Sequence, residues 1–176
     1  MNRSHLEHII RAAAGNADTG DVVVIGSQSI LAAFPEAPSE LLVSVEADVC
    51  PRDRPSDAIL IDGAIGERSI FHEMFGYYAH GVGETTATLP AGWRDRLVPI
   101  RNENTRGATG WCLEVHDLAV SKLVAGREKY MRFLTALFRH HLARPDVVHE
   151  RLKQTILPTD ETRAFAVAAA DFIFSR

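Results

Sequence analysis

The chain has 176 residues, of which 46% are hydrophobic and 24% charged, as in an ordinary globular protein with a buried core. The formal net charge of −4 excludes a protein that coats nucleic acid through a uniformly basic surface. The N-terminal residues lack the charged-then-apolar pattern of a leader, and no apolar run approaches the roughly 18 residues of a membrane helix. We therefore expect a cytoplasmic protein with no membrane partner. Cys50 and Cys112 have no metal-ligand spacing and are predicted to be core thiols.

Charge is distributed unevenly along the chain. Residues 1–100 contain 7 Lys and Arg against 14 Asp and Glu, whereas residues 101–176 contain 12 against 9. An acidic half and a basic half fit a site that holds a metal on one side and phosphate on the other, although a solvated basic helix face explains the same charges.

The pattern of apolar residues predicts an α/β (α+β) chain: a mixed sheet flanked by helices, then a helical C-terminal part. In the first part, the expected helices are 4–15, 27–34 and 56–77, the last with breaks at Gly63 and Gly66, and the expected strands are 22–25, 40–50, 84–90, 96–100 and 110–115. From His116 onward, the expected helices are 116–142, 146–157 and 159–174. We therefore divide the chain into a core of residues 1–115 and a helical part of residues 116–176, packed together as one compact unit.

Two acidic residues interrupt the second expected strand. Glu46 and Asp48 are separated by one position, so their side chains point to the same face of that strand. Carboxylates are poor strand residues, and two placed side by side repel each other unless a positive group lies between them. A divalent cation is the simplest such group, and Mg²⁺ (or Mn²⁺) prefers carboxylate and phosphate oxygens together.

The first expected strand ends at Gly26 and Ser27. A Gly-Ser turn between a strand and a helix directs backbone N–H groups and a hydroxyl toward the space above the helix, where phosphate commonly binds. Together with the acidic pair, the turn outlines a cradle for a nucleoside triphosphate (NTP) and its metal ion.

These motifs resemble those of a known superfamily. The order Ile25-Gly26-Ser27 followed by Glu46-Ala47-Asp48-Val49 is similar to the signature of nucleotidyltransferases. The segment CLEVHDLAVSKLVAGREKYMRFLTALFRHHL resembles the HDL-x-x-SKL-x-AGREKD segment of uncharacterised nucleotidyltransferase-like proteins related to AbiEii-type toxins of toxin–antitoxin systems. LPAGWRDRLVPI and IDGAIGERSIFHEMFGYYAHGV also resemble that family, so the likeness covers most of the chain.

The resemblance implies both a fold and a chemistry. Glu46 and Asp48 would hold the metal and take part in catalysis, and Gly26 and Ser27 would bind the β- and γ-phosphates. The family has Asp after Arg-Glu-Lys, where this chain has Tyr130, which removes one carboxylate. Glu114 and Glu128 are the candidates for the third acidic residue of the superfamily.

Basic residues of the expected helix 116–142 complete the predicted site. At 100° per residue, Lys122 and Lys129 project within about 20° of each other beside Gly126, which gives two ammonium groups for a triphosphate. A pair of surface lysines is the alternative. Arg127 projects into the apolar stripe, so we expect it to be buried, either in an ion pair with a structural Asp or in contact with the nucleotide. His116 and Asp117 are expected to cap the helix.

Two functional hypotheses follow. In the first, the protein is a Mg²⁺-dependent nucleotidyltransferase in which Glu46, Asp48 and Lys122 are catalytic and Gly26, Ser27, Arg127 and Lys129 bind the nucleotide. The resemblance implies a toxin-like enzyme that modifies a hydroxyl of tRNA or of a protein and has a cognate antitoxin. In the second, the protein keeps the fold as a catalytically inactive nucleotide- or partner-binding module, which Tyr130 favours.

Overall fold

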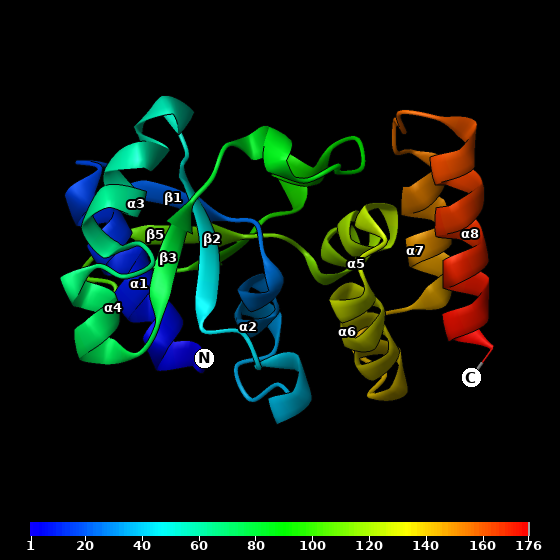
Figure 1. Cartoon of the computed structure of the whole chain (residues 1–176), viewed down its shortest axis with the longest axis horizontal. Coiled ribbons are helices and arrows are strands. Elements are labelled where there is room, and N and C mark those ends of the chain that lie inside the picture. Colours follow the sequence, from blue (N-terminus) through cyan, green and yellow to red (C-terminus); the bar gives the residue numbers. More distant parts are fainter. Residues whose placement is uncertain (176) are drawn as a thin grey trace. The chain divides into compact units, whose positions relative to one another are not determined.

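A computed structural model describes residues 1–175 (Figure 1). The chain forms two compact units, one made of Met1–Thr86 and Leu97–Leu113, the other of Ala87–Arg96 and the chain from Glu114 onward. The predicted domain boundary after residue 115 stays a prediction. Among residues 1–175, no helix has both the length and the apolar character needed to cross a membrane.

A five-stranded sheet forms the centre of the first unit. Its strands are β1 (Asp21–Val24), β2 (Glu46–Pro51), β3 (Tyr78–Gly81), β4 (Val98–Ile100) and β5 (Thr109–Cys112), in the spatial order β3-β2-β1-β5-β4. β1 pairs antiparallel with β2 and parallel with β5, β2 pairs parallel with β3, and β4 pairs antiparallel with β5. The sheet is therefore mixed, as the predicted fold class requires.

Helices cover one face of this sheet. They are α1 (Arg3–Asn16), α3 (Ala58–Ile65) and α4 (Ile70–Phe75), which lie on the same side of the strands in Figure 1. α1 forms where predicted because Leu6, Ile9 and Ile10 recur at helical spacing, and all three are fully buried. α1 packs closely against β5, since a β-carbon on Gly110 of that strand would lie 2.3 Å from Ile10 Cδ1.

Short helical turns fill the connections. α2 (Ile30–Ala33) continues directly from the 3₁₀ turn η1 (Ser27–Ser29), in agreement with the predicted helix 27–34. The other 3₁₀ turns of residues 1–175 are η2 (Ser39–Leu41), η3 (Pro55–Asp57), η4 (Glu84–Thr86) and η5 (Trp93–Arg96). The predicted strand 40–50 is wrong in its first half, because η2 and a loop precede β2. The predicted strand 84–90 is also wrong, because η4 begins that segment.

The predicted helix 56–77 divides into α3 and α4. Gly66 ends α3 as expected, but Gly63 lies inside the helix and does not break it. Gly76 adopts a left-handed conformation with φ 73° and ends α4, after which β3 begins. The sequence pattern missed β3, because the strand has only four residues and the predicted helix 56–77 extended to the residue just before it.

The second unit is helical, as predicted. It contains α5 (Val115–Ala125), α6 (Glu128–Arg139), α7 (Pro145–Lys153) and α8 (Asp160–Phe174), and α5 contacts each of the other three. The expected single helix 116–142 is wrong, because Gly126 takes the left-handed conformation with φ 62° and its N–H donates to the Lys122 carbonyl. Such a turn is a common helix end, so α6 starts in a new direction.

Candidate active site

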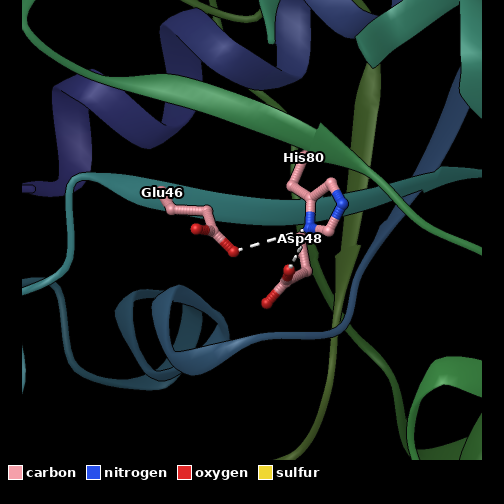
Figure 2. A group of neighbouring side chains, drawn as sticks. All are labelled: Glu46, Asp48 and His80. Carbon is pink, nitrogen blue, oxygen red and sulfur yellow. Dashed lines mark ion pairs between the residues drawn. The ribbon is translucent and has the colours of Figure 1, made fainter. Parts of the chain in front are cut away.

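Two carboxylates lie side by side on β2. Glu46 and Asp48 occupy alternate positions and share one face of the strand, as its period of two requires (Figure 2). Ala47 and Val49 point to the opposite face and are fully buried. The acidic face remains open to solvent, with 37% of the Glu46 side chain and 31% of the Asp48 side chain exposed. A ligand can therefore reach both carboxylates.

The Gly-Ser turn lies against the acidic strand. The Ile25 N–H donates to the Asp48 carbonyl at 3.0 Å, which fixes the end of β1 beside the middle of the site. A β-carbon on Gly26 would lie 2.1 Å from Asp48 Oδ2, so no residue other than glycine fits there without moving the carboxylate. The Gly26 carbonyl accepts from Ser29 N–H, and the Ser29 hydroxyl donates to the Val24 carbonyl at 2.7 Å, which closes the turn.

β3 adds two side chains that sequence reasoning did not identify. In the parallel register of β2 and β3, Tyr78 lies opposite Glu46 and His80 lies opposite Asp48. The Tyr78 hydroxyl donates to Glu46 Oε2 at 2.8 Å. His80 Nδ1 lies 3.4 Å from Asp48 Oδ1 and 3.6 Å from Glu46 Oε1, between the two carboxylates (Figure 2). The one available signal was the polar pair Tyr78 and His80 at strand spacing.

The environment shifts two pKa values in this group. Burial, and then the neighbouring Glu46 carboxylate, raise the pKa of Asp48, while His80 acts in the opposite direction. Burial and the hydrogen bond to Glu46 raise the pKa of Tyr78, so its hydroxyl keeps its proton and remains a donor. The Asp48 and Glu46 carboxylates therefore repel each other, and His80 is the neighbouring group that offsets this repulsion at Asp48.

The residues present fit a divalent cation. Glu46, Asp48 and His80 each offer one donor atom, and the three atoms lie within 4.8 Å of one another. Two carboxylate oxygens and an imidazole nitrogen are ordinary ligands of divalent metals.

The predicted basic residues lie in the second unit, so their participation in this site stays a prediction. Lys122 is buried, and its ammonium lies over the rings of Tyr130 at 4.0 Å and Phe133 at 4.6 Å. Lys129 Nζ lies 5.3 Å from the centre of the Tyr130 ring. The two lysines do not share a helix face, because Gly126 separates α5 from α6, yet both contact the same aromatic ring.

The prediction that Arg127 is buried is wrong. Arg127 is exposed at the N-terminal cap of α6, with its guanidinium 5.5 Å from the Tyr130 ring centre. The new direction of the chain after Gly126 removes it from the apolar stripe. The buried ion pair involves other residues: Asp117, fully buried, accepts from Arg96 at 2.9 Å and from Arg151 at 2.7 Å. Asp117 therefore joins η5, α5 and α7 rather than capping a helix.

The two candidates for a third acidic residue have local roles. Glu114 caps α5, where it accepts from the His116 N–H at 3.0 Å and contacts His116 Nδ1 at 2.5 Å. Glu128 is exposed and pairs with Arg132 one turn along α6. Among the described residues, the third member of the Glu46–Asp48 group is thus a histidine and not a carboxylate.

Comparison with known families identifies the chain's relatives. Residues 4–168 match the model of a family described as a nucleotidyltransferase of unknown function (DUF6036). The chain belongs to this nucleotidyltransferase family. The comparisons with curated proteins and with solved structures found no match.

Membership of the nucleotidyltransferase family supports the general kind of chemistry expected from the Gly-Ser turn and the acidic pair. The matched region includes β1, β2 and β3, and it extends through the second unit to residue 168. Both the acidic residues of β2 and the basic residues around Tyr130 therefore lie within the region that matches the family model.

Proposed function

We propose that the protein transfers a nucleotidyl group from an NTP to a hydroxyl of RNA or protein, with a divalent cation held by Glu46 and Asp48. The observation that carries this proposal is the pair of solvent-accessible carboxylates on β2, with Gly26 packed against one of them. Two adjacent negative charges cost stability in the absence of a cation. An arrangement that concentrates them at an open surface is explained by a metal-bound substrate.

Different residues of the chain would bind the cation and the phosphates. Glu46 and Asp48 would hold the cation, which when bound neutralises phosphate oxygens and lowers the pKa of the acceptor hydroxyl. The turn at Gly26 and Ser27 would contact the β- and γ-phosphates, and Lys122 would stabilise charge on the leaving pyrophosphate. Arg127 and Lys129, both exposed, would bind the nucleotide through its phosphates.

The transfer itself is a substitution at the α-phosphorus. The acceptor oxygen bonds to that phosphorus, the bond from the α-phosphorus to the α,β-bridging oxygen breaks, and pyrophosphate leaves while the acceptor's proton passes to water. Positioning and charge stabilisation supply most of the catalysis in such reactions.

The test is transfer of label from each of the four α-labelled NTPs to bacterial RNA or protein in the presence of Mg²⁺ or Mn²⁺. The wild type should transfer label, whereas Asp48→Asn and Glu46→Gln should not. Asp53→Asn, which changes an exposed carboxylate of the same unit, is the matched control and should retain transfer. Transfer that survives Asp48→Asn contradicts the assignment of the metal ligands.

A second candidate is a catalytically inactive nucleotide-binding or partner-binding module. Tyr130 and the histidine in place of a third carboxylate favour it. This candidate predicts metal-dependent NTP binding by calorimetry, lost in Asp48→Asn, without transfer to any acceptor.

The resemblance to AbiEii-type toxins supports a proposed role as a toxin that modifies tRNA or a protein and is neutralised by a cognate antitoxin. Expression of the wild type in a bacterial host should then arrest growth, and expression of Asp48→Asn should not. Co-expression of an adjacent gene that restores growth would identify the antitoxin. Equal growth with both forms contradicts the toxin role and leaves the transferase proposal intact.

A further inference from the structure

His80 faces both acidic residues from the neighbouring strand. In the register of the parallel pair, His80 is directly opposite Asp48, and the two side chains emerge on the same face of the sheet. Its Nδ1 atom points to the carboxylates (Figure 2), 3.4 Å from Asp48 Oδ1 and 3.6 Å from Glu46 Oε1. Three donor atoms from two strands therefore converge on one point.

The two separations that involve His80 are close to those of ligands around one small cation, and all three donor atoms lie within 4.8 Å of one another. With metal–ligand bonds of about 2.1 Å and angles of about 90° to 109°, neighbouring donor atoms lie about 3.0 to 3.4 Å apart. The two distances from Nδ1 lie at the upper end of this range or slightly beyond it. Since all three side chains are partly exposed, small rotations of their terminal bonds would suffice to close the triangle.

The surroundings hold two of the ligands in place. The Tyr78 hydroxyl occupies Glu46 Oε2 and leaves Oε1 as the oxygen nearest His80. The backbone at Gly26 limits the movement of Asp48 on its other side, where a β-carbon would be only 2.1 Å from Oδ2. Such outer contacts orient metal ligands in proteins and strengthen binding.

We propose that His80 is a third ligand of the cation held by Glu46 and Asp48 and that it makes this centre select divalent transition metals, Mn²⁺ among them, over Mg²⁺. The inference deepens the proposed function, because it concerns the cation at the same carboxylates. Its physical basis is that Mg²⁺ favours an all-oxygen octahedron, whereas imidazole nitrogen is a good ligand for first-row transition metals.

The test uses the full chain after removal of metals with a chelator. Mn²⁺ binding is measured by electron paramagnetic resonance, Mg²⁺ by competition against Mn²⁺, and pulsed resonance methods detect hyperfine coupling between bound Mn²⁺ and nitrogen. We expect one bound Mn²⁺ with nitrogen coupling. His80→Gln should abolish the coupling and weaken Mn²⁺ binding at least about tenfold, with a smaller change for Mg²⁺.

Two further variants sharpen the measurement. His80→Asp restores an all-oxygen set, so it should remove the nitrogen coupling and shift the ratio of affinities toward Mg²⁺. His149→Gln is the matched control: His149 Nε2 also faces a carboxylate, that of Asp171 at 3.3 Å, and its loss should leave Mn²⁺ binding unchanged. Circular dichroism establishes that each variant is folded.

Three results would overturn the inference: bound Mn²⁺ without nitrogen coupling, an affinity within twofold of wild type in His80→Gln, or no Mn²⁺ binding. In each case His80 is not a ligand of the cation. These results are distinguishable from failure of the proposed function. A centre with nitrogen coupling but no label transfer would contradict the transferase alone, and label transfer with Mg²⁺ but no coupling would contradict the histidine ligand alone.

Discussion

Gly26 and Asp48 approach each other so closely that a β-carbon on Gly26 would lie 2.1 Å from Asp48 Oδ2 and 3.0 Å from Asp48 Cγ. The contact joins the turn after β1 to the acidic face of β2. Lack of space explains why residue 26 is a glycine. Its backbone conformation does not require one, because Gly26 is extended with φ −84°. The position of the Asp48 carboxylate and the identity of residue 26 are thus physically coupled.

Gly26→Ala should displace the Asp48 carboxylate. We expect a loss of about 1–3 kcal/mol in the free energy of unfolding, measured with urea, as in other overpacked sites. Mn²⁺ affinity, measured by electron paramagnetic resonance, should fall at least about tenfold, since an aspartate ligand is moved. Gly20→Ala is the control, because a β-carbon there meets nothing within 4 Å. Unchanged Mn²⁺ affinity in Gly26→Ala would show that Asp48 does not bind the metal.

Tyr78→Phe should weaken metal binding without unfolding the protein. The substitution removes the donor that holds Glu46 Oε2 at 2.8 Å, and loss of such a contact lowers metal affinity about 10- to 100-fold. Tyr77→Phe is matched in chemistry and adjacent in sequence, but its hydroxyl contacts His8 Nδ1 at 2.8 Å instead. Mn²⁺ titrations should therefore separate the two variants. Equal affinities would mean that Tyr78 does not position Glu46.

Glu7→Gln should destabilise the protein in a pH-dependent way. Glu7 on α1 is buried and accepts hydrogen bonds of 2.8 Å from Arg3, Asn102 and Asn104. Burial alone would raise the pKa of Glu7, but these hydrogen bonds together hold that pKa below its usual value. A depressed pKa in the folded state stabilises the protein above the unfolded pKa of about 4.3, and this contribution is lost as the pH falls through the folded pKa.

At pH 7 we expect Glu7→Gln to lower the free energy of unfolding by about 1.5–3 kcal/mol, and the difference from wild type to shrink below pH 4.3. Urea titrations between pH 7 and pH 3.5 measure both effects. Glu36→Gln, at an exposed position, should show little difference from wild type at any of these pH values. A constant difference for Glu7→Gln across the series would contradict the role of its charge.

Asp117→Asn should strongly destabilise the helical unit. Asp117 is fully buried between Arg96 and Arg151, and removal of one member of a buried ion pair costs about 3–5 kcal/mol because the remaining charge loses its partner. Asp146→Asn breaks the exposed pair with Arg144 and should leave the thermal midpoint unchanged. Similar midpoints for the two variants would refute a structural role for the Asp117 network.

Both cysteines should be unreactive in the folded protein. Cys50 and Cys112 are fully buried, and burial raises the pKa of the Cys112 thiol to about 12. An aromatic disulfide reagent at pH 8 should therefore label neither thiol in native protein and both in 8 M urea. Rapid labelling of native protein would show that the sheet opens far more readily than its packing implies.

The sequence by itself determined the features that depend on neighbouring positions. Alternation along β2 places Glu46 and Asp48 on one face whatever surrounds the strand, and helical spacing buries Leu6, Ile9 and Ile10 of α1. The Gly-Ser turn after β1 is equally local, because it ends an apolar strand and starts a helical segment. These local patterns also carried the resemblance to nucleotidyltransferases.

Only the tertiary structure decided what lies opposite these residues. The parallel pairing of β2 with β3 brings His80 to Asp48 and Tyr78 to Glu46 across 32 positions of the chain, and no local pattern encodes a register between distant strands. Asp117, predicted to cap a helix, instead binds Arg96 and Arg151. Arg127, predicted to be buried, is exposed because the left-handed turn at Gly126 changes the direction of the chain. The sequence supplied the carboxylates, whereas strand pairing supplied the groups that hold and complete them.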